Sequence, residues 1–126
     1  RNLSMWLVRG METGKPDNDP PSVIKVGFML KKGDRIKNWK RRLFVLRNDG
    51  DVVYYAHKDC PKPRGTINLR DLSDIKHSLG SADMPDSLDL HTPARVWSLH
   101  FDTAAMEKSW TDIIYEYYQK RNSMRL

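Results

Sequence analysis

Basic side chains crowd into one short part of this sequence. Between Lys25 and Arg47 there are nine lysines and arginines and a single acid, Asp34. The whole chain has a formal net charge of +6 at pH 7, so the remainder of the chain is slightly acidic. A cationic site confined to one stretch attracts a polyanion, such as a nucleic acid, an anionic membrane or a multiply phosphorylated headgroup.

This basic stretch is predicted to form a β-hairpin. Large apolar residues occupy every second position from Ile24 to Leu30, which is the period of a half-buried strand. A turn-forming Lys-Gly-Asp follows, and a second apolar run begins at Trp39. We therefore expect strands over residues 24–32 and 39–47, joined by a basic loop.

The hairpin would gather several cations around one point. Alternate side chains of a strand share a face, so Lys40 and Arg42 project together, and pairing of the strands brings Lys31 beside them. Arg35 and Lys37 would overhang from the loop. Exposed basic residues on a strand commonly serve only solubility and protection of a sheet edge. Their concentration against an acidic remainder favours a ligand site instead.

The rest of the chain predicts a mostly β fold with one C-terminal α-helix. Five further short strands are expected, over residues 52–55, 65–69, 72–77, 87–91 and 96–101. A helix should begin near Ala104, capped by Asp102 or Thr103, because apolar residues then recur at helical spacing: Met106, Trp110, Ile113 and Tyr117. Seven antiparallel strands would form a sandwich or barrel, and the helix would close one open end.

At 126 residues the chain has material for one domain. We expect an N-terminal extension and linker over 1–21, the folded domain over 22–122 and a C-terminal tail over 123–126. Within the extension, the apolar residues from Leu3 to Val8 precede a Gly, Pro and Asp-rich linker and receive no function. No apolar run is long enough to span a membrane. A start at Arg1 is expected for a fragment of a longer protein.

The residue types and their spacing do not indicate a catalytic or metal-binding site. Cys60 is the single cysteine, which excludes a disulfide within this chain and fits a cytoplasmic location. The four histidines lack the short spacings that are typical of metal ligands. Acids are scattered singly, and no nucleotide-binding or nucleophile motif is present. We expect no enzyme activity, no metal and no cofactor.

The basic hairpin resembles that of a pleckstrin homology (PH) domain. The residues that carry the resemblance are Gly27-Phe-Met-Leu-Lys31 and Trp39-Lys-Arg-Arg42-Leu-Phe-Val-Leu46, together with Pro63-Arg64-Gly65. The pattern is similar to that of the 3-phosphoinositide-binding subgroup, which includes the general receptor for phosphoinositides and protein kinase B. That subgroup carries a lysine at the end of the first strand and a basic residue, any residue and an arginine on the second.

The resemblance implies a phosphoinositide-binding site and a role for each of its residues. Lys31 would bridge the phosphates at ring positions 3 and 4, and Arg42 would hold the 3-phosphate. The remaining expected contacts are Arg35, Lys40, Tyr55 and Arg64. For Tyr55, which would give its hydroxyl to the 4-phosphate, the alternative is an ordinary strand aromatic.

Two features of the sequence refine this expectation. About four residues separate the sixth and seventh strands, so the additional hairpin of the general receptor is missing, and the site should accept both the 3,4,5-trisphosphate and the 3,4-bisphosphate lipid. The loop residues Lys32, Ile36 and Lys37 are expected to contact the membrane, with Ile36 entering the lipid interface. The alternative for Ile36 is packing against Trp39.

Three functions follow from the basic hairpin. We favour a cytoplasmic module that recruits its parent protein reversibly to membranes by binding a phosphoinositide headgroup. The alternative is a protein-interaction module with weak or nonspecific binding of anionic lipid, since many PH domains use the fold to hold a protein partner. Nucleic acid is disfavoured because the charge is confined to one hairpin and few aromatic residues interleave it.

Overall fold

The computed structural model describes residues 21–78, 84 and 86–124. As the sequence predicted, these residues form seven antiparallel strands followed by a long helix. The strands make one sheet, in the order β4-β3-β2-β1-β7-β6-β5. The strands and the helix have these bounds: β1 (Val23–Lys32), β2 (Trp39–Arg47), β3 (Asp51–Tyr55), β4 (Gly65–Asn68), β5 (Asp74–Ser78), β6 (Ser87–His91), β7 (Val96–His100) and α2 (Ala104–Met124).

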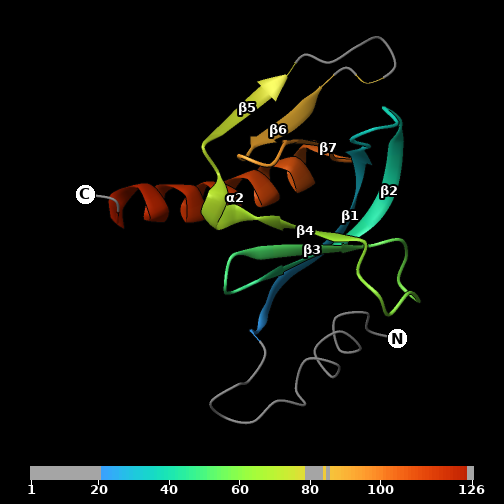
Figure 1. Ribbon diagram of the computed structural model, residues 1–126, viewed down its shortest axis with the longest axis horizontal. Helices are drawn as coiled ribbons and strands as arrows, with labels where there is room; N and C mark the ends of the chain where they lie inside the picture. The colour runs from blue at the N-terminus through green and yellow to red at the C-terminus, as the bar shows by residue number, and fades with distance from the viewer. Residues whose placement is uncertain (1–20, 79–83, 85, 125–126) are drawn as a thin grey trace.

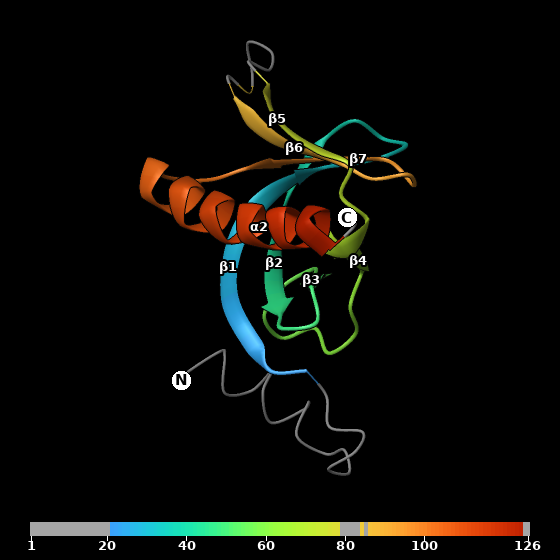
Figure 2. The ribbon, with the colours of Figure 1, turned by 90° about the vertical axis from the view of Figure 1, so that its left-hand side faces the viewer.

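The helix α2 lies across the strands and closes the core (Figures 1 and 2). Trp110 and Ile114 of α2 are almost completely buried, and they belong to the main apolar cluster together with residues of the sheet. Met106, Ile113 and Tyr117 pack against this cluster. The helical face that the spacing predicted is therefore the face that meets the core.

The register of β1, β2 and β3 assigns their side chains to two faces. Phe44 pairs with Gly27 on one side and Tyr54 on the other, and this row faces the core; we call this side of the sheet the inner face. Leu43, one position earlier, pairs with Phe28 and belongs to a separate apolar cluster. We call that opposite side the outer face.

Gly27 allows α2 to approach the sheet closely. A Cβ atom at this position would lie 3.0 Å from Nε1 of Trp110. The helix begins where Thr103 accepts a hydrogen bond from the backbone N–H of Met106 (3.1 Å), so Thr103 provides the side-chain cap. Asp102 instead accepts two hydrogen bonds from the Arg41 guanidinium (2.6 and 3.2 Å).

The boundaries of the middle elements differ from those predicted. The fifth strand was expected at residues 72–77, but β5 spans Asp74–Ser78 and follows a short 3₁₀ helix, η2 (Leu69–Asp71). The Asn68 side chain caps η2 by accepting a hydrogen bond from the backbone N–H of Arg70 (3.0 Å). Leu69 and Leu72 reach the core through this turn rather than along a strand.

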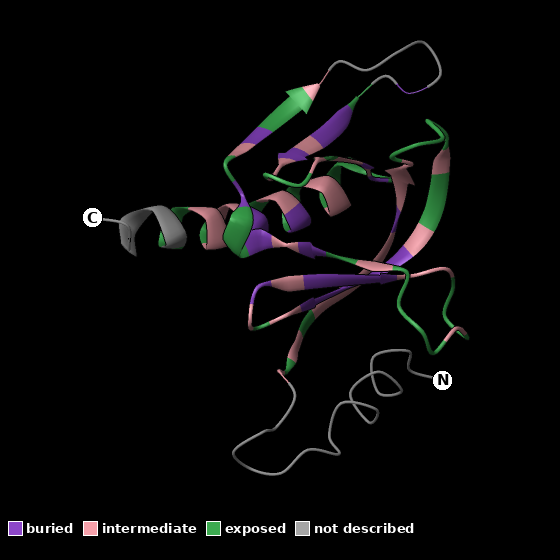
Figure 3. Cartoon of the chain, viewed as in Figure 1, coloured by how far each residue is buried: buried purple, intermediate pink, exposed green. Residues whose placement is uncertain are grey.

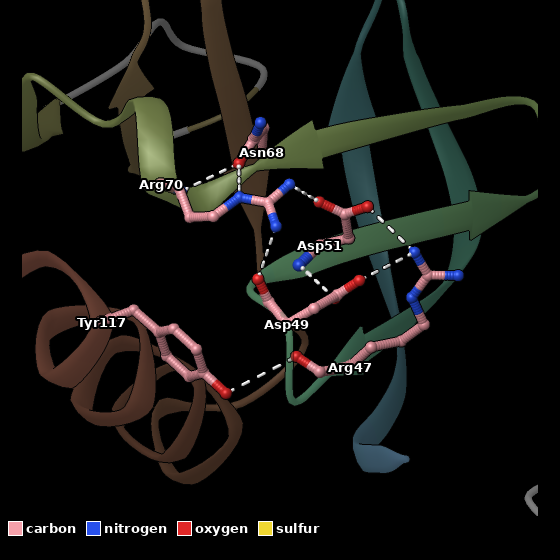
Figure 4. Close-up of polar contacts among 6 residues, drawn as sticks. All are labelled: Arg47, Asp49, Asp51, Asn68, Arg70 and Tyr117. Carbon is pink, nitrogen blue, oxygen red and sulfur yellow. Dashed lines mark hydrogen bonds and ion pairs between the residues drawn. The ribbon is translucent and has the colours of Figure 1, made fainter. Parts of the chain in front are cut away.

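A network of polar side chains holds the β2–β3 turn against η2 and α2 (Figure 4). Asp51 accepts hydrogen bonds from both Arg47 (2.9 Å) and Arg70 (2.7 Å). Gly50 has a φ of 93°, which L side chains rarely adopt, and a Cβ there would also approach the Arg70 side chain. The hydroxyl of Tyr117 donates to the carbonyl of Arg47 at 3.5 Å, which links the turn to α2.

Two of the predicted segments lie largely outside the described residues. Residues 1–20 of the predicted extension are not described, while α2 continues through Met124 into the predicted tail. Most of the segment between β5 and β6 also lies outside them. Within the described part of the chain, no helix is long and apolar enough to cross a membrane.

Candidate phosphate-binding site

The predicted cations meet at the loop end of the β1–β2 hairpin. Lys31 lies directly opposite Lys40, and Arg42 lies opposite Met29, so the three basic residues share the inner face. Figure 3 shows that the exposed part of β2 lies toward the loop, whereas its next four residues, Leu43 to Leu46, are buried. The basic side chains therefore extend the inner face beyond the edge of the apolar core.

A cavity of about 240 Å³ opens between the hairpin and the segment before β4. The residues that line it are Lys31, Gly33, Arg35, Ile36, Asn38, Lys40, Arg42 and Arg64. Five of the six residues predicted to bind the headgroup are thus brought together: Lys31, Arg35, Lys40, Arg42 and Arg64. Among the cavity's lining residues there is no carboxylate to neutralise them.

Lys31 occupies a half-buried position between two aromatic rings. Its Nζ lies 5.0 Å from the ring centroid of Tyr54 and 5.6 Å from that of Trp97. Burial is the largest cause that lowers the pKa of Lys31 below its usual value, and the charges of Arg95 and Arg42 lower it further. The ammonium group is therefore partly desolvated and lies beside other cations, with Asp34 as the opposing charge.

Arg95, which follows the β6–β7 turn, is a member of the site that the sequence did not predict. Its guanidinium lies 4.1 Å from the centroid of Trp97, and Nη2 donates to the carbonyl of Lys32 (3.3 Å). Nε lies 3.9 Å from the carboxylate of Asp34. Arg95 thereby joins β7 to the β1–β2 loop and adds a cation beside Lys31.

The structure does not bring Tyr55 together with the other predicted residues. Tyr55 pairs with Leu43 and packs in the outer-face cluster, while the neighbouring Tyr54 points to the inner face. Burial raises the pKa of Tyr54, and the charges of Arg95, Arg42 and Arg64 oppose this rise. Tyr54 is therefore the tyrosine that lies near the basic cluster.

The residues expected at the membrane lie on the loop beside the cavity. Ile36 exposes 74% of its surface, the largest exposed fraction of the described large apolar residues, and Lys37 is also exposed. Lys32 is half-buried. The ring of Trp39 lies edge-on to His100, with centroids 6.5 Å apart. Within the described residues, no three His, Cys, Asp or Glu side chains are placed to hold a metal ion.

A family model described as the PH domain matches residues 23–117 of the chain. The chain belongs to the PH domain family. The match covers all seven strands and most of α2, which agrees with the fold and with the position of the basic hairpin.

Three known proteins illustrate the similarity. The uncharacterized protein CG43867 of Drosophila melanogaster is 29% identical over 99% of this chain, and a RAC family serine/threonine-protein kinase homolog of Dictyostelium discoideum is 33% identical over 70%. The chain spans 7% and 19% of those two proteins. The C-terminal PH domain of pleckstrin, solved in complex with D-myo-Ins(1,2,3,4,5)P5, is 29% identical, with a TM-score of 0.63 over 75% of this chain and 97% of that one.

Proposed function

We propose that this PH domain binds the headgroup of a phosphoinositide and so recruits its parent protein to membranes. One observation carries the proposal: five basic side chains line one cavity. One of them is Lys31, whose pKa is lowered by burial first and then by the charges of Arg95, Arg42 and Arg64. Such a site gains electrostatic energy when a polyanion enters it. The solved complex of the pleckstrin PH domain with an inositol pentakisphosphate supports this class of ligand.

The geometry suggests which part of the headgroup each side chain would contact. Arg42 presents paired N–H donors that suit one phosphate, whereas the Lys31 ammonium acts as a point charge between two phosphates. Lys40, Arg35 and Arg64 would close the sides of the cavity. We place Tyr54, in the position first expected for Tyr55, beneath the ligand. The PH fold is a non-catalytic module, so the proposed activity is binding alone.

The ligand that we infer is a 3-phosphorylated lipid, either the 3,4,5-trisphosphate or the 3,4-bisphosphate. Two neighbouring phosphates on positions 3 and 4 match the adjacent cations Lys31 and Arg42. The β6–β7 connection is a short turn in which Thr92 bonds Arg95, and no residue of this turn is among those that line the cavity. A cavity without a wall on that side would accept the inositol ring with or without a phosphate at position 5.

Calorimetric titration with soluble inositol phosphates tests the proposal. We expect one-to-one binding of inositol 1,3,4,5-tetrakisphosphate, at least tenfold tighter than inositol 1,4,5-trisphosphate, and its loss in Arg42→Ala. Arg41→Ala is the matched control, because Arg41 has the same charge on the same strand but pairs with Asp102. Absence of saturable binding to either compound would contradict the proposal and favour a protein-docking or nonspecific anionic surface.

A further inference from the structure

The outer face of the sheet carries an apolar cluster of its own. Leu43 and Val45 of β2 are at its centre, with 0% and 1% of their surface exposed. Four partly buried residues surround them: Val23, Val26, Phe28 and Tyr55. This cluster lies on the side of the sheet away from the core, so α2 does not cover it.

The cluster extends across three strands in register. One row runs Phe28, Leu43 and Tyr55, and the next runs Val26, Val45 and Val53. All described members of the cluster come from β1, β2 and β3 themselves. Within the described part of the chain, no other helix or strand contributes a residue to it.

Apolar side chains on both faces are unusual for a sheet of this kind. An antiparallel sheet with one solvated face alternates apolar and polar residues, whereas a strand buried on both faces is almost continuously apolar. The run Leu43-Phe44-Val45-Leu46 is of the second type, and all four residues are buried. We expect that the outer face is covered as well as the inner one.

Arg47 provides a second indication at the end of the same face. Its Nη2 bonds Asp49 and Asp51, but its Nε is buried and has no hydrogen-bond partner among the described residues. A buried N–H without an acceptor costs free energy, so a covering segment that supplies a carbonyl here is favoured. Val23, where the chain enters β1, pairs with Arg47.

We propose that the N-terminal extension of this chain covers the outer face, with its apolar residues packed over Phe28, Leu43 and Val45. The residues that would make this contact are Leu3, Met5, Trp6, Leu7 and Val8. They form the apolar cluster of the extension, and the segment between them and β1 is rich in Gly, Pro and Asp, with Met11 as its one large apolar residue.

The linker is long enough to let the extension fold back onto the outer face of the sheet. Residues 9–22 can reach about 46 Å when extended, at about 3.3 Å per residue. The distance along β1 from Val23 to Phe28 is only about 17 Å at the rise of a strand. The Drosophila melanogaster relative aligns with 99% of the chain, although the PH match begins at residue 23, so the similarity includes the extension.

A double-mutant cycle on the full chain tests the contact. Trp6→Ser with Leu7→Ser alters the extension, and Phe28→Ser alters the outer face. We expect each change to lower the melting temperature by about 5 °C, and the combination to lower it by less than the sum, because both remove the same contact. Hydrogen exchange at the amides of Leu43 to Val45 should accelerate in each variant.

Ile24→Ser is the matched control. Ile24 exposes 43% of its surface and lines a groove against the C-terminal half of α2, away from the cluster. Its effect should add fully to that of the extension variant. Unchanged melting and exchange in the extension variant would overturn the proposal and leave the flanking side chains, such as Arg41 over Phe28, as the cover. A dimer in light scattering, with additive effects in the cycle, would also overturn it in favour of a second copy.

Discussion

Asp34 is an acid placed against the cations of the proposed site. Its carboxylate lies 3.9 Å from Nε of Arg95, and its charge acts to raise the pKa of Lys31 while the neighbouring arginines lower it. An anionic ligand would compete with Asp34 for the same positive field. We therefore expect Asp34→Asn to tighten binding of inositol 1,3,4,5-tetrakisphosphate by about threefold to tenfold, or roughly 0.7 to 1.4 kcal/mol.

Titration calorimetry on Asp34→Asn and Asp71→Asn distinguishes this local effect from net charge. Asp71 is an exposed acid on η2, and its removal changes the net charge by the same amount. Binding should stay within twofold of the wild type in Asp71→Asn. Equal tightening in both variants would mean that the ligand senses the overall charge of the domain rather than Asp34.

Lys31 makes the proposed binding dependent on pH. Because its pKa in the folded protein lies below the usual value of 10.5, Lys31 loses its proton earlier than an ordinary lysine as the pH rises. Between the two pKa values the unfolded chain binds more protons, so this residue's contribution to folding stability rises with pH. A bound polyanion restores the ammonium form, and binding in that window takes up a proton. The affinity therefore falls as pH rises through the lowered pKa.

Calorimetry in two buffers of different ionisation enthalpy measures this proton uptake. We expect uptake that grows as the pH rises from neutral, and its loss in Lys31→Arg, because a guanidinium stays protonated throughout. The same uptake in Lys31→Arg would assign the titration to another group.

Some residues of the proposed site could be predicted from the local sequence, and others could not. The pairing of Lys31 with Lys40 follows from two strands and a loop, and the structure confirms it. Which of Tyr54 and Tyr55 faces the cations depends on the residue at which β3 begins after the Gly50 turn. A shift of one residue would move each side chain to the opposite face of the sheet. Arg95 is distant from the hairpin in sequence, so its position depends on tertiary packing that no local pattern contains.

At the scale of elements, the pairing of β3 with β4 holds the Tyr54 ring, which contacts Lys31, next to Gly65. Gly65 pairs with Tyr54, and a Cβ on Gly65 would collide with the Tyr54 hydroxyl oxygen. Gly65→Ala should therefore displace the Tyr54 ring from beneath Lys31. We expect a loss of about 1 to 3 kcal/mol of stability, typical of overpacking, and at least a threefold loss of headgroup affinity.

Chemical denaturation and calorimetry on Gly65→Ala and Thr66→Ala check this prediction. Thr66 is the exposed neighbour on β4, so its truncation should change neither quantity appreciably. If Gly65→Ala matched Thr66→Ala, the Tyr54 ring would not need the space that glycine leaves.

The seven strands and the helix follow from periodicity, but the connection from β4 to β5 does not. The apolar residues Leu69 and Leu72 were read as parts of strands, because a 3₁₀ turn and a strand both place occasional side chains in the core. In the structure the Asn68 side chain caps η2. Such a cap competes with continued strand pairing, and the balance depends on packing beyond the local sequence.

At the scale of the whole molecule, charge is divided between the two ends of β2. The loop end carries the cavity with its excess of cations, whereas at the other end Arg47 and Arg70 are paired with Asp49 and Asp51. Within the described residues, the loop end of β2 is therefore the more positive one, and the domain should approach an anionic membrane with the β1–β2 loop leading. Ile36 then meets the lipid first.

Replacing Ile36 by glutamate separates membrane contact from headgroup binding. Because Ile36 is 74% exposed, Ile36→Glu should leave the fold intact. We expect about a tenfold loss of binding to vesicles that contain phosphatidylserine and the 3,4,5-trisphosphate lipid, since an apolar contact is replaced by repulsion. Ile36→Gln is the control for charge and should lose only the apolar part. Affinity for soluble tetrakisphosphate should fall by less, because Ile36 lines the cavity only at its rim. Equal losses in both assays would place Ile36 in the headgroup site, and unchanged vesicle binding would exclude its insertion.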